Sequence, residues 1–270
     1  MTRRPLFLAF AMTTLLAAAL FLGGCGNKEQ GFEESFATAT QAAREAGSVH
    51  AQINASLSPL EGEGGMGLNI QGDAWIDMDA GSLEARFTVM GMELSLRYVD
   101  GTAYLQFGGK WYVVEGEVME GVDEGTIDAM ISLLSSVPEI ISSTVELNEL
   151  GEKKVGDYDC TQFEVVPDLQ AISTMDPVRK LAAELDMSED EVLEYLEEAD
   201  VAIEVCIQKD EPIIRRVFLA ATMELPSMGD VVGIPLLPEK ARIEITMDFP
   251  EYGVEVDVQA PEDAKPFEGL

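Results

Sequence analysis

The chain has 270 residues, of which 50 are Asp or Glu and 17 are Lys or Arg, and its formal net charge is −33 at pH 7. This excess of acid argues against nucleic acid as a partner, because phosphate binding needs clustered Lys and Arg. Anionic lipid headgroups are also repelled, so attachment to a membrane has to rest on acyl chains. The acidity indicates solubility or a saline habitat, with an acidic site for a cationic partner as the alternative.

The N-terminus has the layout of an export signal. Arg3 and Arg4 precede an uncharged apolar run from Leu6 to Leu22. A basic start, a short apolar run and small residues at a cleavage site predict a secretory signal peptide over residues 1–24. Residues 25–31 are polar and Gly-containing, which predicts a flexible tether.

Cys25 follows two glycines directly after the apolar run. This arrangement resembles a bacterial lipobox, which implies cleavage before Cys25 and a lipid on its thiol, including acyl groups such as palmitate. It also implies anchoring at the extracytoplasmic face of the bacterial cell membrane. The alternative is a plain signal peptide with an incidental cysteine.

Two further cysteines, Cys160 and Cys206, remain if Cys25 is lipidated. Cys160 shares the parity of Gln162 and Glu164 in its predicted strand, so it is expected on the polar face. Cys206 shares the parity of Glu204 in the same way. Because an exported protein permits oxidation, we predict a Cys160–Cys206 disulfide across adjacent strands, with two free thiols as the alternative.

Alternation of apolar and polar residues dominates the first half of the chain. A helix is expected from Phe32 to Ala46, ending near Gly47. Period-2 patterns then predict a meander of six strands, since turn residues recur every 8–12 positions. The predicted strands are Val49–Leu57, Leu68–Met78, Leu83–Val89, Leu94–Tyr98, Ala103–Phe107 and Lys110–Val114.

Helical patterns interrupt the strands twice in the second half. Residues 123–145 carry apolar side chains at steps of three and four, which predicts an amphipathic helix kinked at Pro138. A second helical block is expected over residues 169–198, where Ser188 and Glu191 form a capping box that starts a separate helix. Further strands are expected at Val145–Leu147, Tyr158–Val166, Val201–Gln208, Ile213–Leu225 and Ala241–Phe249, with a short edge piece at Gly253–Val258. Because both helical blocks lie between strands, residues 32–270 are expected to form one α+β domain.

The residues of common catalytic sites are absent from the sequence. His50 is the only histidine, and we expect it on the polar surface of the first strand. Neither a nucleophile elbow, nor a Walker A loop, nor a Rossmann glycine pattern is present. We therefore expect no catalytic residue, no metal site and no cofactor. A hydrolase with an unrecognised carboxylate pair is the weaker alternative.

The apolar face of the predicted sheet has to be covered, and the helical blocks are the covers that the sequence offers. Incomplete filling would leave an apolar cavity of the type that binds lipids, and the 13 methionines suit an adaptable lining. A solid core is the alternative. The predicted lining residues are Ile76, Phe87, Leu96, Leu105, Ile127, Met130, Ile131, Leu134 and Ile141. The apolar stretch 226–238 is expected either to border the cavity or to contact the membrane, or to be a buried connection.

Four short segments, in order, carry a family resemblance. They are Asp100–Leu105 leading to Gly109–Tyr112, Val155–Tyr158, Val205–Asp210 with Arg215 and Arg216, and Phe249–Gly253 before Ala260 and Pro261. Over residues 32–264 the chain resembles the LppX/LprG-type lipoproteins of the wider LolA/LolB-like group of lipoprotein carriers. The resemblance implies a curved antiparallel sheet, a half-barrel wrapped around helices that cover its concave face, with a cavity for acyl chains.

These expectations combine into one functional hypothesis. The chain is expected to be a membrane-anchored, non-enzymatic lipoprotein that binds or shuttles a lipid or a lipid-conjugated molecule in an apolar cavity. The alternative is a non-carrier lipoprotein with a solid core that acts as a surface interaction or sensor module. The sequence names no protein partner.

Overall fold

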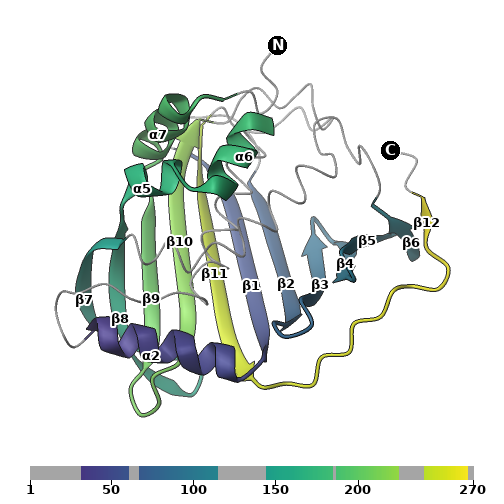
Figure 1. Ribbon diagram of the computed structural model, residues 1–270, viewed down its shortest axis with the longest axis horizontal. Helices are drawn as coiled ribbons and strands as arrows, with labels where there is room; N and C mark the ends of the chain where they lie inside the picture. Colours follow the sequence, from purple (N-terminus) through teal and green to yellow (C-terminus); the bar gives the residue numbers. More distant parts are fainter. Residues whose placement is uncertain (1–31, 61–66, 115–143, 185–186, 225–239, 267–270) are drawn as a thin grey trace.

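The computed structural model describes residues 32–60, 67–114, 144–184, 187–224 and 240–266. One large sheet runs across the molecule, and short helices lie against it (Figure 1). The predicted signal peptide, lipobox cysteine and tether lie outside these residues, as do the apolar stretch 226–238 and residues 123–143 of the helix predicted over 123–145. The last two residues of that predicted helix, Thr144 and Val145, lie in a strand instead. In the described part, no helix is both long and apolar enough to cross a membrane.

The first described element is helix α2, Phe32–Glu45, as the sequence predicts. The chain leaves the helix through Gly47, whose φ of 71° is favourable for glycine. The Gly47 amide donates to the carbonyl of Arg44 at 3.0 Å, which satisfies one of the last helical carbonyls.

Six strands follow as a meander in the predicted positions, with ends that differ by one or two residues. They are β1 Ser48–Pro59, β2 Leu68–Asp77, β3 Ser82–Val89, β4 Met92–Val99, β5 Thr102–Phe107 and β6 Lys110–Val113. The second half adds β7 Thr144–Val155, β8 Tyr158–Pro167, β9 Ala202–Gln208, β10 Ile214–Glu224, β11 Lys240–Tyr252 and β12 Lys265–Pro266.

All twelve strands belong to one sheet with the order β12-β6-β5-β4-β3-β2-β1-β11-β10-β9-β8-β7. Every neighbouring pair is antiparallel except β12 and β6, which are parallel. The sheet is therefore mixed but largely antiparallel. The predicted edge piece at 253–258 is wrong: this segment is extended without strand pairing, and the edge strand forms later, at Lys265–Pro266.

Three short helices form the second helical block: α5 Leu169–Ser173, α6 Asp176–Glu184 and α7 Glu189–Glu198. The capping box is confirmed, since the Ser188 amide donates to Glu191 Oε2 at 2.7 Å and the Glu191 amide donates to Ser188 Oγ at 3.3 Å. With only short helices beside twelve strands, the described part is mostly β, so the predicted α+β balance needs correction.

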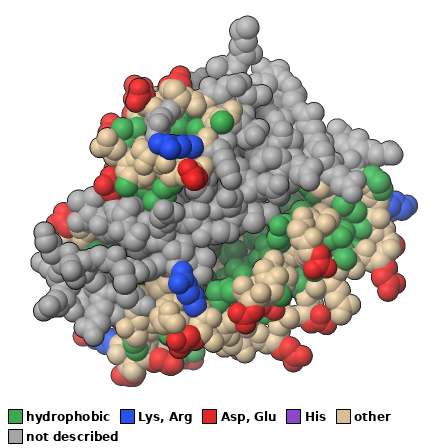
Figure 2. Space-filling model, in the orientation of Figure 1, with side chains coloured by type: hydrophobic (Ala, Val, Ile, Leu, Met, Phe, Trp, Pro, Cys, Tyr) green, Lys and Arg blue, Asp and Glu red, His purple; other side chains and the backbone are tan. Residues whose placement is uncertain are grey.

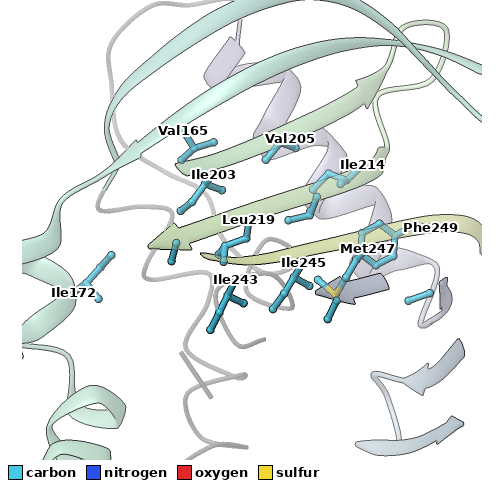
Figure 3. Packing of buried hydrophobic residues seen from close by; sticks show 14 of the residues in the cluster. Val165, Ile172, Ile203, Val205, Ile214, Leu219, Ile243, Ile245, Met247 and Phe249 are labelled. Carbon is cyan, nitrogen blue, oxygen red and sulfur yellow. The ribbon is translucent and has the colours of Figure 1, made fainter. Parts of the chain in front are cut away.

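The core lies between one face of the sheet and the helices (Figure 3). Leu219, Ile243 and Ile245 project from neighbouring strands β10 and β11 and are at most 1% exposed. Helix α2 adds Phe36, Ala39 and Ala43 to the same core and packs against β1, β9 and β10. From the sequence we expected only the later helical blocks to cover the apolar face of the sheet, so the part played by α2 was not predicted. Helices α5–α7 of the second block do contribute to the same core, with Ile172, Val178, Val192 and Leu196.

Candidate functional site

The strand register places four of the predicted lining residues on one face of the sheet. Ile76 is opposite Val49 of β1, whose side chain belongs to the core. On the next strands, Phe87 is opposite Gly72, and Leu96 is opposite both Ala85 and Leu105. Ile76, Phe87, Leu96 and Leu105 therefore lie on the core side of β2–β5. The other five predicted residues, Ile127, Met130, Ile131, Leu134 and Ile141, lie outside the described residues.

We call the core-side residues of these four strands the β2–β5 face. Its members are Leu68, Ile70, Gly72, Ala74, Ile76, Leu83, Ala85, Phe87, Val89, Met92, Leu94, Leu96, Tyr98, Ala103, Leu105 and Phe107. None of them is charged. This composition suits contact with apolar groups.

The β2–β5 face is less buried than the other half of the same face. Leu219 of β10 and Ile245 of β11 are 0% exposed, whereas Phe87, Leu94, Leu96 and Leu105 are all half-buried. Figure 2 shows hydrophobic side chains gathered in a hollow on the side of the molecule where Figure 1 draws these strands. The described part therefore leaves apolar surface on this half that its helices do not bury.

Gly72 gives the face a local shape. A Cβ built there would stand 2.5 Å from Cδ1 of Phe87 and 2.2 Å from the carbonyl oxygen of Arg86. The Phe87 ring thus packs directly on the backbone of β2, which only glycine allows. In the sequence, Gly72 interrupts the alternation of apolar and polar residues along β2, but nothing in that pattern indicates the contact with Phe87.

The opposite face of the same strands is polar and tightly paired. Glu84 accepts from Arg86 Nε at 2.9 Å and from Arg97 Nε at 3.1 Å. The Arg97 guanidinium lies 4.7 Å from the centroid of the Trp111 ring and donates to the carbonyl of Gln259 at 3.2 Å. These contacts tie the extended C-terminal segment to the outer side of the sheet.

His50 lies on this outer face, as predicted, but not as an isolated surface residue. Its Nε2 is 2.9 Å from Asp73 Oδ1 on β2, and its Nδ1 is 3.6 Å from Glu251 Oε2 on β11. The side chain is 13% exposed. Sequence reasoning missed both carboxylates because they lie on different strands, far from His50 in the chain. Among the described residues, no cluster of three His, Cys, Asp or Glu side chains is arranged to hold a metal ion.

The predicted Cys160–Cys206 disulfide is wrong, because both cysteines are free. The register explains the difference: Cys160 is opposite Gln208, and Cys206 is opposite Gln162. The two cysteines are therefore diagonal neighbours, whose Cα atoms lie about 7–8 Å apart in a typical sheet, and a disulfide across that separation requires backbone movement. Both are also buried, against Val155 and Tyr158, rather than on an open polar surface. Burial raises the pKa of both thiols, that of Cys206 to about 11.

Arg215, which the sequence analysis named only as part of the family resemblance, is a buried cation. It is 7% exposed, and its Nη1 donates to the carbonyls of Phe249 and Pro250, both at 3.1 Å. Its guanidinium carbon lies 3.7 Å from the centroid of the Tyr158 ring. These bonds join β10 to the end of β11, so we assign Arg215 a structural role.

Neither protein-family models nor curated proteins match the sequence. Among solved structures, the lipoprotein LppX of Mycobacterium tuberculosis is similar at 11% identity and a TM-score of 0.48, covering 84% of this chain and 97% of LppX. LprF of Mycobacterium bovis is similar at 12% identity and a TM-score of 0.46, covering 87% and 99%.

An outer membrane lipoprotein-sorting protein domain from Vibrio parahaemolyticus is similar at 8% identity and a TM-score of 0.26, covering 78% of this chain and 88% of that domain. The expected similarity to LppX-type lipoproteins and to the LolA-like group is confirmed over most of the chain at low identity. At these values it concerns the overall arrangement of the fold and transfers no site residue.

Proposed function

We propose that this protein binds the acyl part of a lipid, or of a lipid-conjugated molecule, against the β2–β5 face. The observation that carries the proposal is an uncharged face of four adjacent strands whose large side chains, including Phe87, Leu96 and Leu105, are only half-buried. An acyl chain that covers this partly exposed apolar surface is removed from water together with the surface, and this burial lowers the free energy of the complex.

The energetic scale is adequate for binding. Each CH₂ group removed from water stabilises a complex by about 0.8 kcal/mol, so ten such groups give about 8 kcal/mol before the costs of association. The affinity needs no charged residue, which agrees with the composition of the β2–β5 face. The chemistry of a headgroup is not specified by these strands.

The proposal includes the location of the protein. Residues 1–24 would act as the signal peptide, residues 25–31 as the tether, and residues 32–270 as one lipid-binding domain anchored through lipid on Cys25 at the extracytoplasmic face of the membrane. The sheet would curve around the acyl chain as a half-barrel. Replacement of Cys25 by alanine should release the protein from the membrane fraction or block its processing; retention there would refute the anchor.

A pair of tryptophan variants tests the binding face. Leu105→Trp places a large ring on the β2–β5 face, whereas Gln106→Trp places the same ring on the outer face of the same strand. If the face is free to bind acyl chains, Leu105→Trp should reduce lipid uptake from vesicles and leave the free energy of unfolding nearly unchanged. Gln106→Trp should change neither quantity.

The opposite result would support a solid core. In that case Leu105→Trp overpacks the interior and lowers the free energy of unfolding by about 1–3 kcal/mol. If this loss occurs and the wild-type chain never takes up lipid, the carrier proposal is wrong and an interaction or sensor module is the better account.

A further inference from the structure

The turn between β3 and β4 has a geometry that its sequence does not suit. Val89 is opposite Met92, so Met90 and Gly91 form a two-residue hairpin turn. Met90 has a φ of 51° and Gly91 a φ of 79°. Positive φ at both positions defines the type I′ geometry, which favours Asn-Gly or Asp-Gly. Methionine is strained there because its Cβ crowds the following carbonyl.

The next hairpin provides an internal comparison. Between β4 and β5 the same geometry recurs, with Asp100 at a φ of 52° and Gly101 at 77°. That turn carries the residue pair that the geometry favours, whereas the Met90 turn does not. Met90 suits neither the backbone conformation of the turn nor a surface in contact with water. This mismatch indicates that Met90 has a role other than stabilising the turn.

The Met90 turn is also the most apolar exposed point of the described part. Met90 is 56% exposed and Met92 is 49% exposed, and they are two of the four large hydrophobic residues that are exposed there. Residues 88–92 contain no charged side chain. The long, flexible thioether side chains adapt readily to an irregular apolar partner.

This turn continues the β2–β5 face without a polar break. Met92, Leu94 and Leu96 alternate along the core side of β4, and Val89 pairs with both Met92 and Ile70. A lipid that reaches the face from this end of the strands passes over the two methionines. A second protein copy is a poor occupant, since two chains of charge −33 repel each other.

We propose that Met90 and Met92 form a lip that contacts the lipid bilayer and passes acyl chains between it and the β2–β5 face. This inference rests on the proposed function and adds the partner, a bilayer surface, and the residues that meet it. The two side chains insert among the acyl chains at the interface, where their exposure to water ends.

Oxidation of methionines in the full chain, attached to phosphatidylcholine vesicles, tests the contact. A water-soluble oxidant excluded from bilayers should attack Met90 and Met92 more slowly than the half-buried Met78, which follows β2 at the opposite end of the strands. If Met90 and Met92 react faster than Met78, as their exposure in water dictates, they do not contact the bilayer. Protection that appears without vesicles as the protein concentration rises would assign the turn to a second copy and overturn the proposal.

Lipid transfer tests the role of the contact. Met90→Asn installs the favoured Asn-Gly turn, so its melting temperature should be no lower than that of the wild type. Because it removes one apolar anchor, it should slow the uptake of a fluorescent phospholipid from vesicles by about tenfold. Leu150→Asn, at a 51% exposed position on the edge strand β7, is the matched control and should not slow uptake.

The outcomes separate the two proposals. If the wild type takes up lipid and Met90→Asn does so at the same rate, the proposed role of the Met90–Met92 lip is wrong, whereas the proposed lipid binding at the β2–β5 face is not contradicted. If the wild type takes up no lipid, the proposed function is wrong and the lip is wrong with it.

Discussion

The imidazole of His50 is stacked on the indole of Trp75, with ring centroids 4.9 Å apart and ring planes within 2° of parallel. The Arg86 guanidinium lies 5.2 Å from the Trp75 ring centroid. Since His50 also meets Asp73 of β2 and Glu251 of β11, this one side chain connects three neighbouring strands on the outer face.

Replacement of His50 by alanine should therefore weaken the sheet beside the β2–β5 face. The stacked pair and its hydrogen bond together predict a loss of about 1–2 kcal/mol in the free energy of unfolding. Trp75 fluorescence should change with the loss of its neighbour. Gln52→Ala, at an exposed position of the same strand, is the control. Equal stability of the two variants would show that the stack contributes nothing.

Because the Cys206 thiol is buried, we expect the folded protein to lose stability at alkaline pH. Burial raises its pKa to about 11, above the value of a thiol in an unfolded chain, about 8.5. The folded state thus favours the protonated thiol. The stabilisation that the protonated Cys206 thiol gives is complete below the pKa of the thiol in the unfolded chain. It is lost as the pH rises through the pKa of the thiol in the folded protein. The loss should reach about 2–3 kcal/mol near pH 11.

Urea unfolding of the wild type and of Cys206→Ala between pH 8 and 11 measures this contribution. The difference in stability between the two proteins should shrink as the pH rises. In addition, two thiols besides Cys25 should become titratable in the unreduced protein only when it unfolds. A constant difference, or the absence of these thiols after unfolding, would contradict the structure.

Gly72→Ala should destabilise the protein through the contact with Phe87. The new methyl group would stand 2.2 Å from the Arg86 carbonyl oxygen, so the backbone has to shift, at a cost of about 1–3 kcal/mol. Asn69→Ala, at an exposed position of the same strand, should stay within about 0.5 kcal/mol of the wild type. Unchanged melting of Gly72→Ala would show that Phe87 does not pack on β2 as described.

Local pattern was sufficient to predict most of the secondary structure. Alternation at Val49, Ala51 and Ala55 indicated β1, and all three side chains are buried in the core. The Ser188 capping box marked the start of α7, because its signal lies within four consecutive residues. Signals of this kind depend on neighbours in the chain, which the sequence displays directly.

Features that depend on register were not predictable in the same way. The parity of Cys160 and Cys206 correctly put them on one side of the sheet, but the two-residue offset that separates them arises only when β8 pairs with β9. Likewise, Asp73 and Glu251 reach His50 through pairing on either side of β1. The core-side placement of Ile76, Phe87, Leu96 and Leu105 followed from parity, whereas their partial burial depends on where the helices pack.

The most direct test of the lipid-binding proposal is native mass spectrometry of the full chain purified from its own host. We predict a non-covalent adduct with the mass of a lipid, which is lost on denaturation, whereas a covalent lipid on Cys25 is retained. Binding at the β2–β5 face further predicts that the adduct is reduced in Leu105→Trp and preserved in Gln106→Trp. A native mass equal to the denatured mass, in protein that has been exposed to its host membranes, would contradict the proposal.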